Sequence, residues 1–276
     1  MEKVGIIGYG NMGRSIAERI KSKYSICVFD KDKNKILVSE NVSAANSSVD
    51  LVNQSEIIIL AVKPQDFDFL LNEIKLSVQG KLIITIAAGI TIRYIKSRLG
   101  ENVRVVRVMP NMPAQVGQGV AVLFKGQSAS ENGLNSALQL ACDIFSNLGA
   151  VLVVDKEEMV DAATAVSGSG PAFFCYYIKE NKNAALKRDE FIKMLTDSAV
   201  SLGFDLREAE FLSEKTVDGI IAMLIERNLT CAEIIKLVTS KGGTTQAGID
   251  VLSSGGSVED AVKSAYRRAG QLGQGS

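Results

Sequence analysis

A glycine-rich turn near residue 8 constrains the fold of this chain more than any other feature of its sequence. The segment IIGYGNMG (6–13) contains the pattern G-x-G-x-x-G, at the end of the apolar run 3–8 and before a segment with helical spacing, 11–22. In such a strand–turn–helix unit the glycines permit a tight turn, a close approach to a pyrophosphate and close helix–strand packing. The helix N-terminus adds free N–H groups. The pattern predicts a dinucleotide-binding Rossmann domain; a glycine-rich turn without a ligand is the alternative.

The rest of the first half alternates between strand-like and helix-compatible segments. Polar stretches separate further apolar runs at 25–30, 57–62, 81–88, 103–109, 120–124 and 150–154. Strands that alternate with helices predict βαβ units. We therefore expect an α/β fold with a mostly parallel sheet.

The second half has a different pattern after Asp155. Apolar residues recur three and four positions apart, as in Met194, Leu195, Ala199 and Leu202, which is typical of helices. The predicted helices cover 157–166, 171–181, 188–202, 206–226, 230–238, 244–253 and 257–271. We predict a Rossmann domain over 1–155 and an all-helical domain over 156–276. The helical half is small and apolar, so we expect it to bury a face against a second copy of the chain.

The composition excludes several classes of function. Lys+Arg and Asp+Glu both number 31, which disfavours a nucleic-acid partner. The chain has no histidine, so serine–histidine and cysteine–histidine nucleophiles are excluded, and we predict no metal site. No apolar run approaches the roughly 18 residues of a membrane span. The four cysteines form no CxxC pair and the first residues do not look like a signal peptide, so we expect a cytoplasmic protein.

Asp30 bears on which nicotinamide cofactor the first half would take. It ends the second predicted strand, 22 residues after Gly8, where a carboxylate can accept from the adenosine ribose. That position slightly favours NADH, but Lys31 and Lys33 follow at once and would offset the charge in favour of NADPH. Asp30 could also simply begin the next turn. The choice between NADPH and NADH stays open.

Other strand-end loops are predicted to border the same site. The chain has only 4 prolines, and they lie at strand ends or helix starts, where parallel sheets bind ligands. One such loop is AVKP (61–64); small residues in TIAAGI (85–90) would let a flat ring approach the backbone. The predicted cofactor-binding residues are Gly8, Tyr9, Gly10, Asn11, Met12, Gly13, Asp30, Ala61, Val62, Lys63, Pro64, Ala87 and Ala88.

A second glycine-rich stretch, TSKGGTTQAG (239–248), lies far from the first. Successive N–H groups near Gly242 and Gly243, at the start of a predicted helix, would form a nest for a small anion. Ser240 and Thr245 would add hydroxyl donors and Lys241 a charge. The alternative is a helix start with nothing bound.

These segments resemble the pyrroline-5-carboxylate reductase family. The matching stretches span residues 4 to about 252 and are GYGNMG, LAVKPQ, VRVMPNMPAQVGQG, DAATAVSGSGPAFF and VTSKGGTTQAGIDVL. The resemblance implies a Rossmann domain followed by a helical domain that interlocks between two subunits, in dimers that commonly assemble to decamers. It also implies transfer of hydride from NADPH or NADH to the C=N carbon of 1-pyrroline-5-carboxylate, giving L-proline in the last step of proline biosynthesis.

The resemblance also assigns roles to residues. It implies that the substrate is held by Ser240, Gly242, Gly243, Thr244, Thr245 and Glu157. We expect the Thr245 hydroxyl to be catalytic, through a hydrogen bond to the ring nitrogen. Glu157 could equally be a first-turn carboxylate that stabilises a helix dipole. The chain departs from the family at Lys241, where proline is usual, and at Leu237, where asparagine is usual.

Two other functions remain open from the sequence. A related nicotinamide enzyme of the β-hydroxyacid dehydrogenase type would share the layout but carry a catalytic lysine on a helix. A non-catalytic protein that binds NAD would need the first glycine-rich turn but no second anion site. Whether other cyclic imines are substrates also stays open.

Overall fold

The computed structural model describes residues 2–126, 131–180 and 184–274. Within them an eight-stranded sheet has the order β3-β2-β1-β4-β5-β6-β7-β8. Neighbouring strands are parallel except β6 and β7, which are antiparallel. The strands are β1 (Lys3–Ile7), β2 (Ser25–Phe29), β3 (Val42–Ala44), β4 (Ile57–Leu60), β5 (Leu82–Thr85), β6 (Arg104–Met109), β7 (Gly119–Lys125) and β8 (Gly149–Val153).

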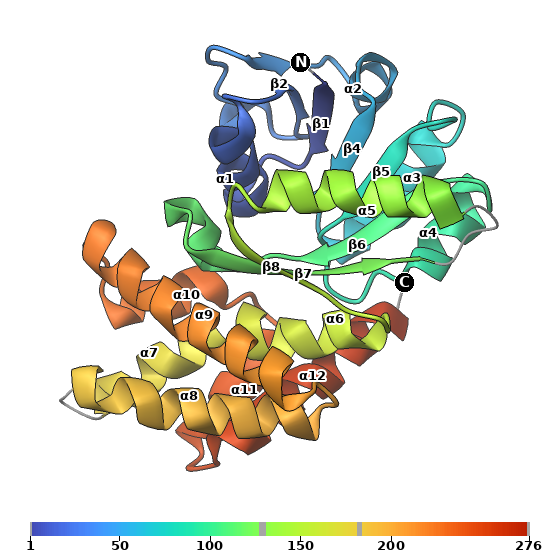
Figure 1. Ribbon diagram of the computed structural model, residues 1–276. Coiled ribbons are helices and arrows are strands. Elements are labelled where there is room, and N and C mark those ends of the chain that lie inside the picture. The colour runs from blue at the N-terminus through green and yellow to red at the C-terminus, as the bar shows by residue number, and fades with distance from the viewer. Residues whose placement is uncertain (1, 127–130, 181–183, 275–276) are drawn as a thin grey trace.

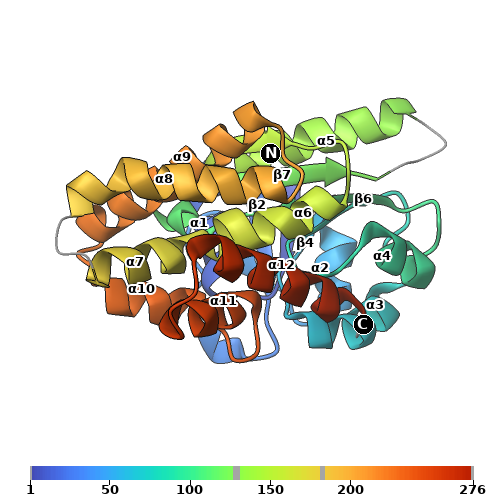
Figure 2. The same cartoon turned by 90° about the horizontal axis from the view of Figure 1, so that it is seen from below.

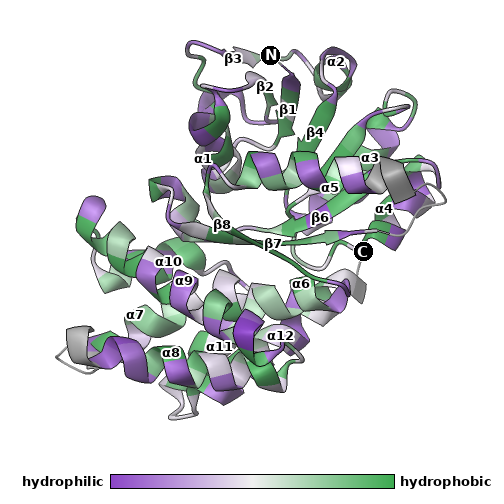
Figure 3. Ribbon diagram, in the orientation of Figure 1, coloured by the Kyte–Doolittle hydropathy of each residue, from purple (hydrophilic) through white to green (hydrophobic). Residues whose placement is uncertain are grey.

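Helices cover both faces of the sheet because successive strand residues point to opposite sides (Figure 1). Ile6 and Ile59 belong to the core under α1 (Asn11–Ile20) and α5 (Glu131–Phe145). Ile7 and Ile58 belong to the opposite core. That core is covered by α2 (Ser48–Gln54), α3 (Phe67–Ile74) and α4 (Ile92–Leu99). In Figure 3 the strands are accordingly mostly in the hydrophobic colour.

The second half of the chain is helical and packs beneath the β6–β7–β8 side of the sheet (Figures 1 and 2). Its core is continuous with the sheet, because Met109, Val120 and Val122 share one buried cluster with Phe173 and Leu195. The helices are α6 (Glu158–Ala163), α7 (Gly170–Glu180), α8 (Ala184–Ser201), α9 (Leu206–Glu226), α10 (Cys231–Val238), α11 (Thr244–Ser253) and α12 (Val258–Gln274).

The architecture confirms the predicted fold class and each predicted strand. Two features were not predicted. β3 contains only three residues with a single buried position, which is too little for a pattern. The predicted helix 157–166 ends at Ala163, and a π-helical turn, Thr164–Gly168, joins it to α7. Such turns often occur at functional sites. No described helix is long and apolar enough to span a bilayer.

Candidate functional site

Backbone contacts fix the first glycine loop, residues 8–13. Gly8 has a φ of +101°, and a Cβ there would lie 2.6 Å from the backbone of Ala61. A Cβ on Gly13 would lie 2.0 Å from the carbonyl oxygen of Gly8. Neither position has room for a side chain, so β1, β4 and α1 meet closely at this point.

The N-terminus of α1 has free space around it at Gly10, whereas Gly8 and Gly13 do not. Gly10 is its N-cap residue and offers no side-chain acceptor, and the first turn contains no acidic residue. A Cβ on Gly10 would meet nothing within 4 Å. The first N–H groups of a helix have no partner within the helix, so this end can hold an anion. The geometry fits the pyrophosphate of a dinucleotide.

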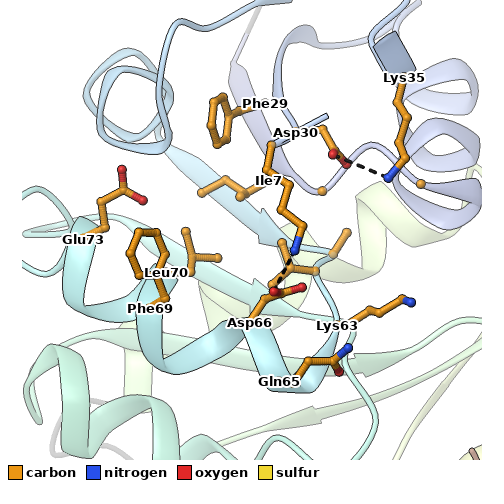
Figure 4. Close-up of a pocket in the computed structure, with 15 residues that line it drawn as sticks. Ile7, Phe29, Asp30, Lys35, Lys63, Gln65, Asp66, Phe69, Leu70 and Glu73 are labelled. Carbon is orange, nitrogen blue, oxygen red and sulfur yellow. Dashed lines mark hydrogen bonds and ion pairs between the residues drawn. The ribbon is translucent and has the colours of Figure 1, made fainter. Parts of the chain in front are cut away.

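The carboxylate of Asp30 accepts hydrogen bonds from two backbone N–H groups, one in the first glycine loop and one in the turn after β2. Its Oδ2 accepts from the Tyr9 N–H at 2.7 Å and its Oδ1 from the Asp32 N–H at 2.9 Å. The Nζ of Lys35 lies 3.7 Å from Oδ1, as Figure 4 shows. The carboxylate therefore ties β2 to the first glycine loop whatever else it binds.

A lysine bridges the cavity beside Asp30. The Nζ of Lys31 lies 2.8 Å from Oδ1 of Asp66, and this hydrogen bond raises the pKa of Lys31. Figure 4 shows Asp66 on the side of the cavity across from Asp30. A ligand that enters along this wall would meet both charges of an exposed ion pair, which screening makes weak.

The second glycine loop, residues 240–245, also begins a helix without a side-chain cap. The Gly243 N–H donates to the Ser240 carbonyl at 2.9 Å, and Gly242 has a φ of +70°. Gly243 is the extended N-cap residue of α11, whose first turn has no acidic residue. The N–H groups that begin α11 are therefore available to a small anion.

A hydroxyl cluster joins this loop to the π-helical turn. Thr245 is buried, and its Oγ1 donates to Oγ of Ser169 at 3.2 Å. Oγ1 of Thr244 lies 3.2 Å from the same oxygen. The family resemblance implies that SGSGP (167–171) lies beside the active site, but it does not single out Ser169 within that stretch. The π-helical turn before Ser169 was not predicted.

Most of the predicted site residues line one of three cavities, and neighbouring cavities share a lining residue. A cavity of about 320 Å³ is lined by Gly8, Gly10, Asp30, Ala61, Val62 and Lys63. A second, of about 690 Å³, is lined by Lys63, Pro64, Ala88, Ser240, Gly242, Gly243 and Thr244. A third, of about 230 Å³, is lined by Asn11, Met12, Thr244 and Thr245. Lys63 joins the first cavity to the second, and Thr244 joins the second to the third.

The third cavity, which we call the Thr245 chamber, has a distinctive lining. Its other walls come from the loop after β6, the π-helical turn and the end of α10. Among the described residues that line it there is no Asp, Glu, Lys, Arg, Cys or Tyr. The chamber offers hydroxyl and amide groups but no side chain that can gain or lose a proton near neutral pH.

Four predicted site residues line none of these cavities. The Tyr9 side chain is buried in the core, and its loop contribution is the N–H bound to Asp30. Gly13 packs against Gly8, and Ala87 is buried beside the end of β5.

Glu157, the fourth of these residues, contacts α4 and β6. Its Oε1 accepts from the Ile92 N–H at 2.7 Å and lies 3.5 Å from Nη1 of Arg107. Arg107 is fully buried on β6 and also pairs with Asp161 on α6. Glu157 thus joins the sheet, α4 and the helical half, and its role in binding substrate stays a prediction.

Comparison with known proteins adds a family to this geometry. Residues 3–89 match the family described as NADP oxidoreductase coenzyme F420-dependent. Residues 189–272 match the family described as pyrroline-5-carboxylate reductase dimerisation. The pyrroline-5-carboxylate reductase of Methanosarcina acetivorans is 32% identical, over 99% of this chain and 98% of its own. That of Aquifex aeolicus is 32% identical, over 92% of this chain and 90% of its own.

Solved structures agree with these matches. The pyrroline-5-carboxylate reductase of Coxiella burnetii is 30% identical with a TM-score of 0.63, over 98% of this chain and 97% of its own. The Plasmodium falciparum pyrroline carboxylate reductase with NADP bound is 26% identical with a TM-score of 0.63, over 99% of this chain and 98% of its own. A glycerol-3-phosphate dehydrogenase from Coxiella burnetii is 12% identical with a TM-score of 0.58, and shares the fold alone.

Proposed function

The chain belongs to the pyrroline-5-carboxylate reductase family, and we propose that the connected cavities are its active site. It is an oxidoreductase that reduces 1-pyrroline-5-carboxylate to L-proline with NADPH or NADH, the last step of proline biosynthesis. One observation carries the assignment to this site. The uncapped starts of α1 and α11 open onto the same chain of cavities, so a cofactor phosphate and a substrate carboxylate can be bound in one cleft.

The cofactor would lie along the first glycine loop. The open face at Gly10 and the start of α1 would hold its pyrophosphate, with the adenosine in the cavity beside Asp30. The walls at 61–64 and Ala88 would lie on the path toward the Thr245 chamber. When bound, the nicotinamide supplies the hydride. The protein's part is to orient the substrate and exclude water.

The substrate would be held by its carboxylate at the second glycine loop, with its ring in the Thr245 chamber. No side chain lining the chamber among the described residues can supply a proton, so the imine would enter already protonated. Thr245 donates its own hydrogen to Ser169, which leaves the Thr245 oxygen free to accept from the N–H of the protonated ring. We propose that this contact orients the ring for hydride transfer.

Two further assignments complete the proposal. The match to a dimerisation family over 189–272 supports a homodimer built by the helical domain, 156–276, and dimers could assemble further to decamers. The Rossmann domain would be 1–155. The four cysteines are free, which supports a cytoplasmic enzyme.

The test is loss of reduced-nicotinamide absorbance on addition of 1-pyrroline-5-carboxylate, with NADPH and NADH in parallel and L-proline measured as product. Thr245→Val keeps the shape of the side chain and removes its hydroxyl. We expect kcat/KM to fall about 10²-fold, with cofactor affinity unchanged. Wild-type kcat/KM in this variant would remove Thr245 from the mechanism. Folded wild-type protein that binds NADP(H) or NAD(H) but turns over neither would overturn the proposed function.

A further inference from the structure

An arginine outside both glycine loops contacts the second of them. Arg268, on α12, donates from Nε to the carbonyl oxygen of Gly242 at 2.7 Å. Its Nη1 donates to Oε1 of Gln271 at 3.1 Å, which holds the guanidinium in place. Arg268 also lines the 690 Å³ cavity with Ser240, Gly243 and Thr244.

This contact fixes one peptide group of the loop at both ends. The Gly242 carbonyl and the Gly243 N–H belong to the same planar peptide. Arg268 holds the carbonyl, and Ser240 accepts from the N–H at 2.9 Å. Gly242 has a φ of +70°, and glycine moves readily between conformations, so the sequence alone does not hold the turn. With this peptide fixed, the next N–H groups, at the start of α11, keep one direction.

The same helix also contacts the cofactor side of the cleft. A Cβ on Gly89 would lie 2.6 Å from the Gly273 nitrogen and 3.1 Å from the Ala269 carbonyl oxygen, so α12 packs directly on the turn after β5. Ala88 in that turn lines the same cavity as Arg268. Figure 2 shows α12 running from beside α11 toward α3 and α4. One helix, α12, therefore contacts both sides of the cavity and sets the spacing between them.

The charges in this cavity favour an anion. Lys63 and Lys241 line it with Arg268. Asp68 also lines it, but its Oδ1 lies 2.8 Å from Nη2 of Arg98 and accepts from the Tyr94 hydroxyl. The positive charge at the second glycine loop is therefore not balanced by that carboxylate.

We propose that Arg268 is a positioning residue for the substrate carboxylate. By holding the Gly242–Gly243 peptide, it directs the N–H groups that begin α11 into the cleft, at the spacing from the cofactor side that α12 sets. This inference rests on the proposed function of the same cleft.

The test compares Arg268→Ala and Arg268→Lys with Arg267→Ala, a matched control on the same helix whose side chain is exposed and lines none of these cavities. In Arg268→Ala we expect the KM for 1-pyrroline-5-carboxylate to rise about tenfold. The variant loses the hydrogen bond from the charged Arg268 to Gly242, and a free-energy loss of that size corresponds to about a tenfold change. kcat should stay within about twofold and the Kd for NADPH should not change. Lysine should recover part of the loss, because an ammonium can reach one carbonyl but not hold it as rigidly. Arg267→Ala should behave as wild type.

Binding of L-proline to the protein, measured by calorimetry, supplies a readout that does not need turnover. Weaker L-proline binding in Arg268→Ala supports the positioning role of Arg268 even if the wild-type protein reduces no imine, a result that would overturn only the proposed function. An unchanged KM and an unchanged L-proline affinity would overturn the positioning role. So would a parallel fall in melting temperature, kcat and NADPH affinity, since that pattern describes a merely structural residue.

Discussion

The two glycine loops begin helices in the same way but are held by different kinds of contact. Both helices start at a glycine without a side-chain cap, whereas α2, α4, α9 and α10 start at capping side chains: Ser47, Thr91, Asp205 and Thr230. The first loop is clamped by backbone at Gly8 and Gly13. The second is held by side chains, since a Cβ on Gly243 would meet Ser240 Oγ and Arg268 holds Gly242. The Gly8–Gly13 contact lies within the glycine pattern itself and can be recognised from the sequence, whereas the Arg268–Gly242 hydrogen bond comes from another helix and cannot.

The largest effect should come from breaking the backbone clamp. Gly13→Val would place a branched side chain against the Gly8 carbonyl, 2.0 Å from its Cβ position, and neither backbone can move away cheaply. We expect the free energy of unfolding to fall by about 3 kcal/mol and NADPH binding to be lost. Denaturant unfolding and NADPH fluorescence titration measure the two effects.

Gly10→Ala tests the same loop at a glycine that has free space around it, and so separates the effect on NADPH binding from the effect on stability. Its Cβ meets nothing within 4 Å, so stability should change by less than about 1 kcal/mol, while the methyl group occupies the face on which the pyrophosphate would lie. We expect NADPH affinity to fall at least about tenfold. An affinity equal to wild type would mean that the phosphate does not approach this glycine.

The side-chain clamp should break more gently. In Gly243→Ala the new Cβ lies 2.2 Å from Ser240 Oγ, the end of a side chain that can rotate. We expect the KM for 1-pyrroline-5-carboxylate to rise about tenfold and stability to fall by about 1 kcal/mol, with NADPH affinity unchanged. Adding Ser240→Ala should restore the stability but not the KM, because a predicted substrate hydroxyl is then missing. Recovery of both would exclude Ser240 from the site.

The smallest effect should come from a capped helix. Thr230 Oγ1 accepts from the Glu233 N–H at the start of α10, so Thr230→Ala should cost about 1 kcal/mol of stability and leave kcat and KM unchanged.

The contribution of this cap should also depend on pH. Hydrogen bonds from the Thr230 backbone and hydroxyl hold the pKa of Glu233 below its ordinary value. A depressed pKa contributes stability above the unfolded value, about 4.3, and loses it as pH falls. The loss of unfolding free energy caused by Thr230→Ala, measured by chemical denaturation, should therefore become smaller below that pH. A loss that does not change with pH would mean that the Glu233 carboxylate does not take part in the cap.

The same distinction explains what the sequence could predict. The turn at 8–13 was recognisable because the spacing G-x-G-x-x-G follows a strand-like run and precedes a segment with helical spacing, and the segment 244–253 because its residues suit a helix. Arg268 carries no local signal, and Ser169 was indicated only through the family resemblance of its stretch, SGSGP. Each contacts a loop that only the tertiary fold brings near. Glu157 was linked to the substrate by family resemblance, but its described contacts are with Ile92 and Arg107, which no spacing in the sequence indicates.

The buried Arg107 has a consequence for how the enzyme responds to ionic strength. Its guanidinium is fully buried between β6 and α6, where dissolved ions screen charge far less than at the surface. The Lys31–Asp66 pair is exposed and should weaken as salt is added. The joint between sheet and helical half should therefore keep its alignment in concentrated salt. The mouth of the cofactor cavity would loosen under the same conditions.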